Sequence, residues 1–129
     1  MNDTQRARME ETIHQMVAEL LVKKIKDPRV SNVSITRVEI SKDYSLAKIS
    51  YNIIGSKDDL DKVAEGLKSC SGFIRRNIKK HVRLRVIPEL IFIYDSSLDR
   101  AMKLEELIDQ IHRENQKGSI NHNGGIDGD

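Results

Sequence analysis

"VSNVSITRVEISKDYSLAKISYNII", residues 30–54, contains two segments rich in β-branched residues, 30–41 and 44–54, separated by a tight connection. β-branched side chains favour strands, and two such segments around a short connection predict a β-hairpin. The second segment alternates cleanly, and its apolar residues share one face: Ala47, Ile49, Tyr51 and Ile53. The hairpin is therefore the starting point of the predicted fold.

The first segment changes the parity of its apolar positions part-way along. Its apolar residues are Val33 and Ile35, followed by Val38 and Ile40. One extra residue between the two pairs would return both to the same face of the strand. We therefore predict a β-bulge near Thr36 and Arg37.

The segment before the hairpin has the pattern of an amphipathic helix over residues 4–25. Its apolar residues recur at helical spacing: Met9, Ile13, Met16, Val17, Leu20 and Leu21. Pro28 disfavours helical geometry at the residue before it and has no N–H to donate, so we predict a turn over 27–29.

The segment after the hairpin predicts a second helix, which starts near Ser56 with Asp59 three residues on. Its apolar register continues on both sides of Gly72: Leu60, Val63, Ala64, Leu67, Cys70, Ile74 and Ile78. We interpret this as two helices that meet at a kink. Gly72 could make the kink, allow a close approach of another backbone or a phosphate, or be a tolerated glycine.

The rest of the chain predicts a strand, a helix and a tail. The apolar run 90–94 lacks strict alternation, which is typical of a strand covered on both faces. A helix capped near Ser96 follows, with this apolar stripe: Leu98, Ala101, Leu104, Leu107, Ile108 and Ile111. Residues 116–129 have almost no apolar side chains and are expected to be disordered.

The predicted order is therefore α, β, β, α kinked to α, β, α, an α+β fold in a single domain of residues 1–115. A hairpin joined by a helical crossover to a third strand makes a small three-stranded sheet. A right-handed crossover places the helices mainly on one face of that sheet, with partial cover on the other.

Composition narrows the classes of function. The 129 residues are 38% hydrophobic and 33% charged, with a net charge of +2. We see no run of roughly 18 apolar residues that would cross a bilayer and no apolar leader. Cys70 is the only cysteine, which excludes an internal disulfide and is consistent with a reducing compartment. We therefore expect a cytoplasmic protein.

Positive charge is concentrated just after Gly72. Between Phe73 and Arg85 there is no carboxylate, and six cationic residues occur: Arg75, Arg76, Lys79, Lys80, Arg83 and Arg85. Adjacent cations on one helix face bind phosphates by releasing counterions, and arginine adds bidentate geometry. A solvated helix face or a membrane surface are the alternatives, although Phe73 is the only bulky aromatic residue nearby.

A second basic set flanks the first helix: Arg6, Arg8, Lys23, Lys24 and Lys26. Lysines at a helix end also stabilise the macrodipole, so these residues have both a structural and a nucleic-acid interpretation. Catalysis has little support, because no nucleophile elbow, phosphate-binding glycine loop or paired metal-ligand motif is present. We predict no catalytic residue, no metal site and no cofactor, and we interpret Cys70 as a small core residue.

Several stretches together resemble the bacterial ribosome-binding factor A family over residues 4–112. They are "DPRV", "VEISKDYSLAKISY", "SGFIRRNIKK" and "LRVIPELIFIYDSSLD", in this order, followed by the closing helix. The resemblance implies a KH-like domain of the second topological type. In that family a helix-kink-helix built on Ala-x-Gly replaces the usual GxxG loop, and the matching positions here are Cys70, Ser71 and Gly72, with cysteine in place of alanine.

The resemblance also implies a function. Such factors are not enzymes; they bind the free or immature small ribosomal subunit, assist late maturation of its ribosomal RNA and support growth in the cold. A GTPase assembly factor is thought to promote their release. We therefore expect a monomer that binds ribosomal RNA through both basic sets. The alternatives are a protein-interaction adaptor and a generic KH-like RNA-binding protein outside the ribosome.

Overall fold

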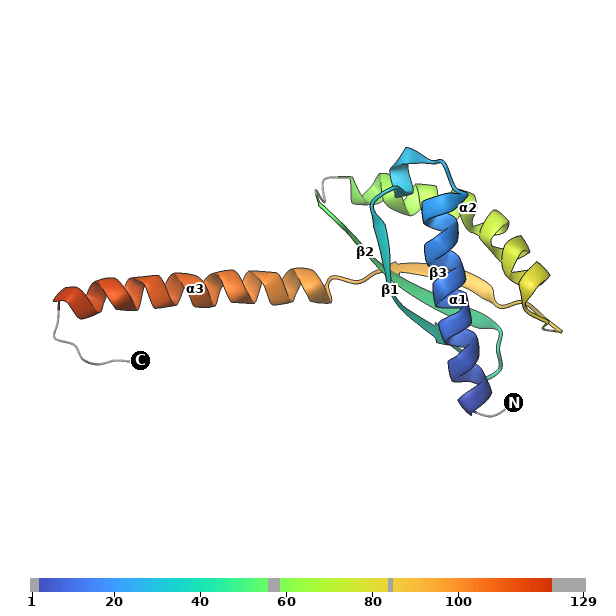
Figure 1. The fold of residues 1–129 in the computed structure, drawn as a ribbon, viewed down its shortest axis with the longest axis horizontal. Coiled ribbons are helices and arrows are strands. Elements are labelled where there is room, and N and C mark those ends of the chain that lie inside the picture. The colour runs from blue at the N-terminus through green and yellow to red at the C-terminus, as the bar shows by residue number, and fades with distance from the viewer. Residues whose placement is uncertain (1–2, 56–58, 84, 122–129) are drawn as a thin grey trace. The chain divides into compact units, whose positions relative to one another are not determined.

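The computed structural model describes residues 3–55, 59–83 and 85–121 (Figure 1). Its elements follow in this order: α1 (Asp3–Lys23), the 3-10 helix η1 (Pro28–Val30), β1 (Val33–Ile40), β2 (Leu46–Ile53), α2 (Leu60–His81), β3 (Glu89–Tyr94) and α3 (Ser97–Asn121). This order of helices and strands is the predicted one. The chain divides into two compact units, Met1–Asp95 and Ser96–Asp129. The single domain of residues 1–115 stays a prediction.

The first unit contains a three-stranded sheet in the order β1-β2-β3. β1 and β2 form the predicted antiparallel hairpin, and β3 pairs with β2 in parallel. A parallel pair needs a crossover, which α2 supplies. Backbone hydrogen bonds from Glu89 N to Ser45 O (2.9 Å) and from Asp95 N to Tyr51 O (2.7 Å) extend the β2–β3 pairing at both ends.

The predicted β-bulge is confirmed in β1. Ile35 pairs with Tyr51 and Arg37 pairs with Ser50, so Thr36 is the extra residue. The inserted residue restores a common face, and Ile35 and Val38 are both buried. The change of parity in the sequence therefore corresponds to the β-bulge in the strand.

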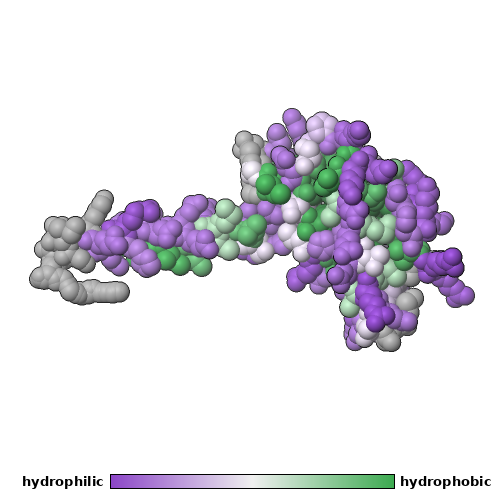
Figure 2. Space-filling model, viewed as in Figure 1, coloured by the Kyte–Doolittle hydropathy of each residue, from purple (hydrophilic) through white to green (hydrophobic). Residues whose placement is uncertain are grey.

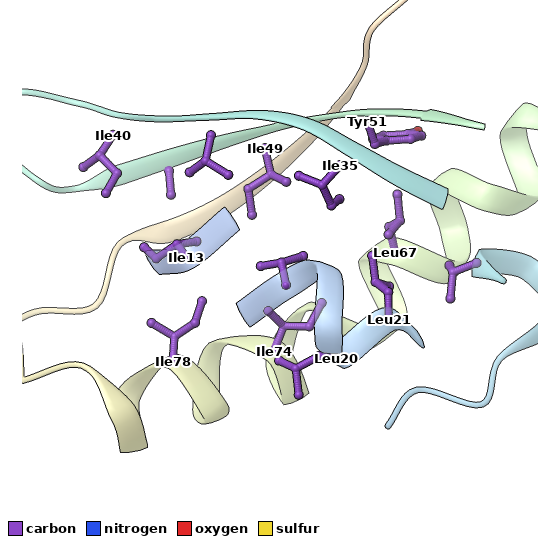
Figure 3. Packing of buried hydrophobic residues seen from close by; sticks show 14 of the residues in the cluster. Ile13, Leu20, Leu21, Ile35, Ile40, Ile49, Tyr51, Leu67, Ile74 and Ile78 are labelled. Carbon is purple, nitrogen blue, oxygen red and sulfur yellow. The ribbon is translucent and has the colours of Figure 1, made fainter. Parts of the chain in front are cut away.

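The core lies between the sheet and the two helices α1 and α2 (Figure 3). Side chains of the sheet, such as Ile49, point toward Ile13 of α1 and Leu67 of α2, and these three are fully buried. Ile74 and Ile78 continue the buried stripe of α2. Burying apolar side chains of this size contributes about 1.5–3 kcal/mol each.

The third strand differs from the prediction in its cover. We expected the apolar run 90–94 to be covered on both faces, but Ile91 and Ile93 are 39% and 40% exposed. Leu90, Phe92 and Tyr94 pack against the core. β3 ends the sheet on one side, and α1 and α2 cover a single face, so every second residue of the run faces away from the core.

The turn before the sheet packs directly against α2. The Asp27 side chain accepts a hydrogen bond from Arg29 N (2.9 Å), and its carboxylate also binds the Arg29 guanidinium, with 2.6 Å between Oδ2 and Nη2. A Cβ at Gly66 would lie 2.9 Å from Val30 Cγ1 and 3.0 Å from Arg29 Cβ. Only a glycine at this position lets the turn and the helix meet.

α2 is one hydrogen-bonded helix through Gly72, not two separate helices, and its axis changes direction part-way along (Figure 1). Gly72 is exposed, and a Cβ there would meet only Arg76 Nη1, at 3.4 Å. Two expected apolar contacts are absent, because Leu60 and Ala64 are exposed. The helix begins at Leu60, and the expected start at Ser56 lies outside the described residues.

The hairpin turn is held by a short polar network. The Asp43 carboxylate accepts hydrogen bonds from the hydroxyls of Ser41 (2.8 Å) and Ser45 (2.7 Å). These bonds, chiefly the one from Ser45, lower the pKa of Asp43 to about 2. Tyr44 adopts a φ of 63°, a left-handed conformation that is uncommon for a bulky residue. The network therefore fixes a turn that the local backbone alone would not favour.

The second unit contains α3. Ser96 receives hydrogen bonds from Arg100 on its backbone oxygen (3.0 Å) and its hydroxyl (2.7 Å), in agreement with the predicted start. Its apolar stripe is exposed, with Leu104 at 57% and Ile111 at 47%, and Figure 2 shows hydrophobic residues among the hydrophilic ones along this helix. The helix continues to Asn121, beyond the residue where we expected disorder to begin; residues 122–129 lie outside the described residues.

Candidate nucleic-acid interface

The second half of α2 presents its cations to solvent because of its helical register. Ile74 and Ile78 are buried against the core, so the positions between and beyond them face outward. Arg76, Lys79 and Lys80 are all exposed. In Figure 2 this half of α2 is covered by hydrophilic side chains. The predicted separation of an apolar face from a cationic face is confirmed for this helix.

These cations have no carboxylate beside them within the part of the chain that the structure describes. By contrast, Arg29 pairs with Asp27, and Lys48 lies 3.8 Å from Glu39. Like charges four residues apart, such as Arg76 and Lys80, destabilise a helix by about 0.2–0.5 kcal/mol per pair. The basic face therefore carries a small cost in stability and leaves its charges available to an anion.

Arg75 differs from its neighbours because its guanidinium is already engaged. Nη2 donates to the backbone oxygen of Ile87 (2.8 Å), and Nε donates to that of Pro88 (3.2 Å). Ile87 and Pro88 are both buried. Arg75 thus ties α2 to the segment that leads into β3, and its guanidinium is only partly available to a ligand.

A hollow of about 340 Å³ opens beside this tie. It is lined by residues of α2 and of the segment after it: Gly72, Arg75, Arg76, Lys79, Arg85 and Ile87. Arg85 is exposed, and it joins the cations of α2 although it lies outside the helix. Arg83 is also exposed but does not line the hollow.

The second basic set is divided between the two ends of α1. Lys23 and Lys24 line a groove of about 320 Å³ between α1 and α2, together with Asn77 and His81. Lys23 also lies 3.7 Å from Glu19, and Arg6 lies 3.0 Å from Asp3. The structure thus brings Lys23 and Lys24 next to α2.

The remaining residues of that set are Arg8 and Lys26, both exposed. The rise of about 1.5 Å per residue places Arg6 and Arg8 about 22–26 Å along α1 from Lys23. The two ends of α1 could therefore contact RNA only as separate parts of an extended footprint.

The three predicted kink residues lie within the continuous helix. The Ser71 hydroxyl donates to Lys68 O (2.9 Å), and the Cys70 thiol lies 3.4 Å from Leu67 O. Side-chain bonds to a preceding turn compete with the helix ladder and often bend helices. Burial raises the pKa of the Cys70 thiol, which fits a packing residue better than a nucleophile. The assignment of the bend to Gly72 stays a prediction.

Other kinds of site find no support in the described part of the chain. It contains no group of three His, Cys, Asp or Glu side chains placed to hold a metal ion. His14 is used in packing, since its Nε2 lies 3.0 Å from Ile35 O. Among the described helices, none combines the length and apolar character needed to cross a membrane.

Sequence reasoning missed two contacts that shape this region. The close approach that we considered for Gly72 occurs at Gly66, where side chains of the turn lie against the helix. Its only signal in the sequence was a glycine within the buried stripe of the helix. The tie from Arg75 to Ile87 and Pro88 had no signal, because it joins residues 12 and 13 positions apart across an irregular segment.

The comparisons with known proteins identify the family. The model of the ribosome-binding factor A family matches residues 5–108 of this chain. The chain belongs to the ribosome-binding factor A family. A ribosome-binding factor A from Nitrosomonas europaea is 43% identical over 103 residues, which cover 80% of this chain and 88% of that protein.

Two structures of ribosome-binding factor A proteins are similar to this chain. The solution structure of a candidate ribosome-binding factor A from Thermotoga maritima is 32% identical, covers 75% of this chain and 93% of its own, and has a TM-score of 0.64. A homology model of ribosome-binding factor A from Thermus thermophilus, fitted into the cryo-EM map of a complex with the 30S subunit, is 21% identical, covers 70% of this chain and 96% of its own, and has a TM-score of 0.57. The predicted α+β fold and the KH-like domain that the family resemblance implied are thereby confirmed.

Proposed function

We propose that this protein binds the small ribosomal subunit in its free or immature form and assists late maturation of the ribosomal RNA. One observation carries the proposal: Arg76, Lys79 and Lys80 lie side by side on an exposed helix face with no carboxylate partner among the described residues. Membership of the family supports it, as does the complex of the Thermus thermophilus protein with the 30S subunit.

The contact we propose is with the RNA backbone rather than with bases. Tyr51 and Tyr94 form an edge-to-face pair with 5.7 Å between ring centroids, and Tyr51 is buried, so these rings are used in packing. Exposed lysines and arginines neutralise phosphates and release counterions, which gives affinity that depends steeply on salt. Arg83 and Arg85 extend this surface beyond α2, and Lys24 and Lys26 extend it toward α1.

The direct test neutralises three cations of α2 in the variant Arg76→Gln, Lys79→Gln, Lys80→Gln. The matched control is Lys42→Gln, Lys62→Gln, Lys68→Gln, which removes the same charge from exposed positions elsewhere. Binding to purified small subunits is measured by sedimentation at several salt concentrations. We expect the first variant to bind more weakly, with a salt dependence that is flatter by about one unit of slope for each phosphate that the protein no longer neutralises. The control should behave as the unmodified protein does.

A folded first variant with unchanged affinity and slope would contradict the proposal. Unfolding curves of the same preparations distinguish weaker RNA binding from a failure to fold. Gradient sedimentation of cell extracts addresses the alternative of an RNA-binding protein outside the ribosome. We expect the protein with free small subunits and not with translating ribosomes.

The proposal includes finer statements that rest on the family resemblance. We propose a cytoplasmic monomer that acts by binding alone, needs no cofactor, supports growth in the cold and is released with the help of a GTPase assembly factor. Deletion of the gene should then slow growth more at low than at high temperature. Sedimentation equilibrium of the purified protein should give the mass of one chain, 14.8 kDa.

A protein-interaction adaptor is the second candidate function, and the exposed stripe of α3 favours it. Leu107 and Ile108 of that stripe are 54% and 43% exposed. Exposed apolar surface of this kind often marks a protein contact. RNase treatment of the isolated complex separates the two functions: loss of the partner supports RNA binding, and persistence supports the adaptor.

A further inference from the structure

The hollow beside α2 combines charge and space in a way that the rest of the basic face does not. Arg76 and Lys79 approach it from the helix, and Arg85 approaches it from the segment that follows. Its volume of about 340 Å³ is roughly ten times the 30 Å³ that one water occupies in the liquid. Exposed cations that converge on one space repel each other unless an anion lies between them.

Arg75 binds the segment that carries Arg85. Arg85 to Pro88 lie outside any helix or strand, and the buried side chains of Ile87 and Pro88 anchor this segment. The Arg75 guanidinium uses two different nitrogens to bind two successive backbone oxygens of that anchor. Lysine has a single nitrogen and cannot reproduce this planar fork. Arg75 therefore lines the hollow and also holds the segment beside it. The second role depends on the planar shape of the guanidinium and not on its charge alone.

Gly72 keeps another side of the hollow open. The residue is exposed and helical, so neither burial nor an unusual backbone conformation requires a glycine there. A Cβ at this position would lie 3.4 Å from Arg76 Nη1, one of the groups that line the hollow. A side chain would occupy part of this space, and the flexible Arg76 side chain would have to share it.

We propose that this hollow binds one backbone phosphate of the RNA, with Arg76, Lys79 and Arg85 as contacts and Arg75 as the positioning residue. This inference rests on the proposed function and assigns one defined phosphate site within it. The other cations of α2 and α1 would add affinity without defining a position. The phosphate bound in the hollow would then fix the position of the RNA strand on the protein.

Inorganic phosphate is the probe for the site alone. Its titration is followed by backbone amide NMR at Gly72, Arg76 and Arg85. We expect saturable shifts at these amides, weakened about fivefold or more in Arg75→Lys although the formal charge is unchanged. Arg85→Gln should weaken binding by a similar factor. Shifts spread evenly over all exposed lysines, or an Arg75→Lys variant that binds as the unmodified protein does, would overturn the site.

Gly72→Ala keeps the test informative if Arg75→Lys loses stability. Alanine is the better helix former, so the variant should unfold at a temperature no lower than the unmodified protein. Its phosphate binding should nevertheless be weaker than that of the unmodified protein, because the new methyl group takes space beside Arg76 that the phosphate would use. Ser69→Ala, an exposed position on the same helix that does not line the hollow, is the matched control and should leave binding unchanged. Equal phosphate binding by Gly72→Ala and Ser69→Ala would contradict the proposal.

Subunit binding separates the failure of this inference from the failure of the proposed function. If the protein sediments with small subunits while Arg75→Lys, Arg85→Gln and Gly72→Ala bind them normally, the defined phosphate site is wrong and the broader function stands. If phosphate binds at the hollow but the unmodified protein never sediments with small subunits, the site stands and the proposed function is wrong.

Discussion

Two glycines in α2 look alike in the sequence, but their surroundings differ. Gly66 lies against the turn at Arg29 and Val30, where a Cβ would collide with side chains at 2.9–3.0 Å. Gly72 lies at the surface beside a cationic hollow. The first position requires glycine for packing, and the second favours it for the space that it leaves. Only the tertiary structure separates these two roles.

Gly66→Ala should destabilise the protein. The added methyl group pushes the 3-10 turn away from α2, and overpacking of this kind costs about 1–3 kcal/mol. Urea denaturation followed by circular dichroism measures the destabilisation, and Gly72→Ala is the matched control on the same helix. Equal midpoints for the two variants would show that the turn moves aside without cost.

Asp43 should make stability depend on pH in acid. Its folded-state pKa is lowered to about 2 from a usual value of 3.8, so its stabilising contribution is full above pH 3.8 and is lost as pH falls through about 2. Asp43→Asn should therefore flatten the dependence of the unfolding midpoint on pH between about 4 and 2. Thermal unfolding at half-unit pH steps checks this. If the unfolding midpoint of Asp43→Asn depends on pH as steeply as that of the unmodified protein, Asp43 does not cause the acid sensitivity.

At the scale of the elements, the β-bulge shows where sequence reasoning succeeds. The parity change between Ile35 and Val38 is a local pattern, and a two-residue periodicity leaves few ways to bury both side chains. The cover of β3 was harder to predict, because exposure of Ile91 and Ile93 depends on which face the helices occupy. The tie from Arg75 was beyond prediction, since it depends on the path of an irregular segment.

Deletion of Thr36 should destabilise the sheet more than Thr36→Val. Without the extra residue, either Ile35 or Val38 must turn away from the core, at about 1.5–3 kcal/mol for a side chain that is no longer buried. Thr36→Val keeps the bulge and removes the hydrogen bond from its hydroxyl to Asp95 Oδ2 (3.1 Å). Denaturant midpoints of the two variants compare these effects, and equal values would mean that the strand does not need the inserted residue.

At the scale of the whole molecule, the first compact unit has a hydrophobic core of its own. Among the described residues, those that form this core or pack against it lie between Met9 and Tyr94. The sequence predicted a long amphipathic last helix correctly, and the place of that helix within a single domain stays a prediction. An apolar stripe indicates that a helix has a face to bury, without stating what covers that face.

A chain cut after Asp95 should therefore fold cooperatively. Asp95 is retained because its N–H bonds to Tyr51 O and its backbone oxygen accepts from Asn52 Nδ2 (2.8 Å). We expect its melting temperature within a few degrees of that of the full chain, and the same for a chain cut after Asn115. A chain cut after Pro88 lacks β3 and should not fold. Failure of the first fragment to unfold cooperatively would show that α3 supports the core.

The single cysteine of the chain provides a built-in reporter of local opening. Cys70 is half-buried on α2, between the part of the helix that meets the turn and the part that carries the cations. Burial raises the pKa of its thiol, so a thiol reagent should modify Cys70 slowly while α2 is packed against the core. Modification should proceed faster when α2 separates from the core. The rate of modification, with and without small subunits, would then measure how far RNA binding stabilises this helix, with no label added to the protein.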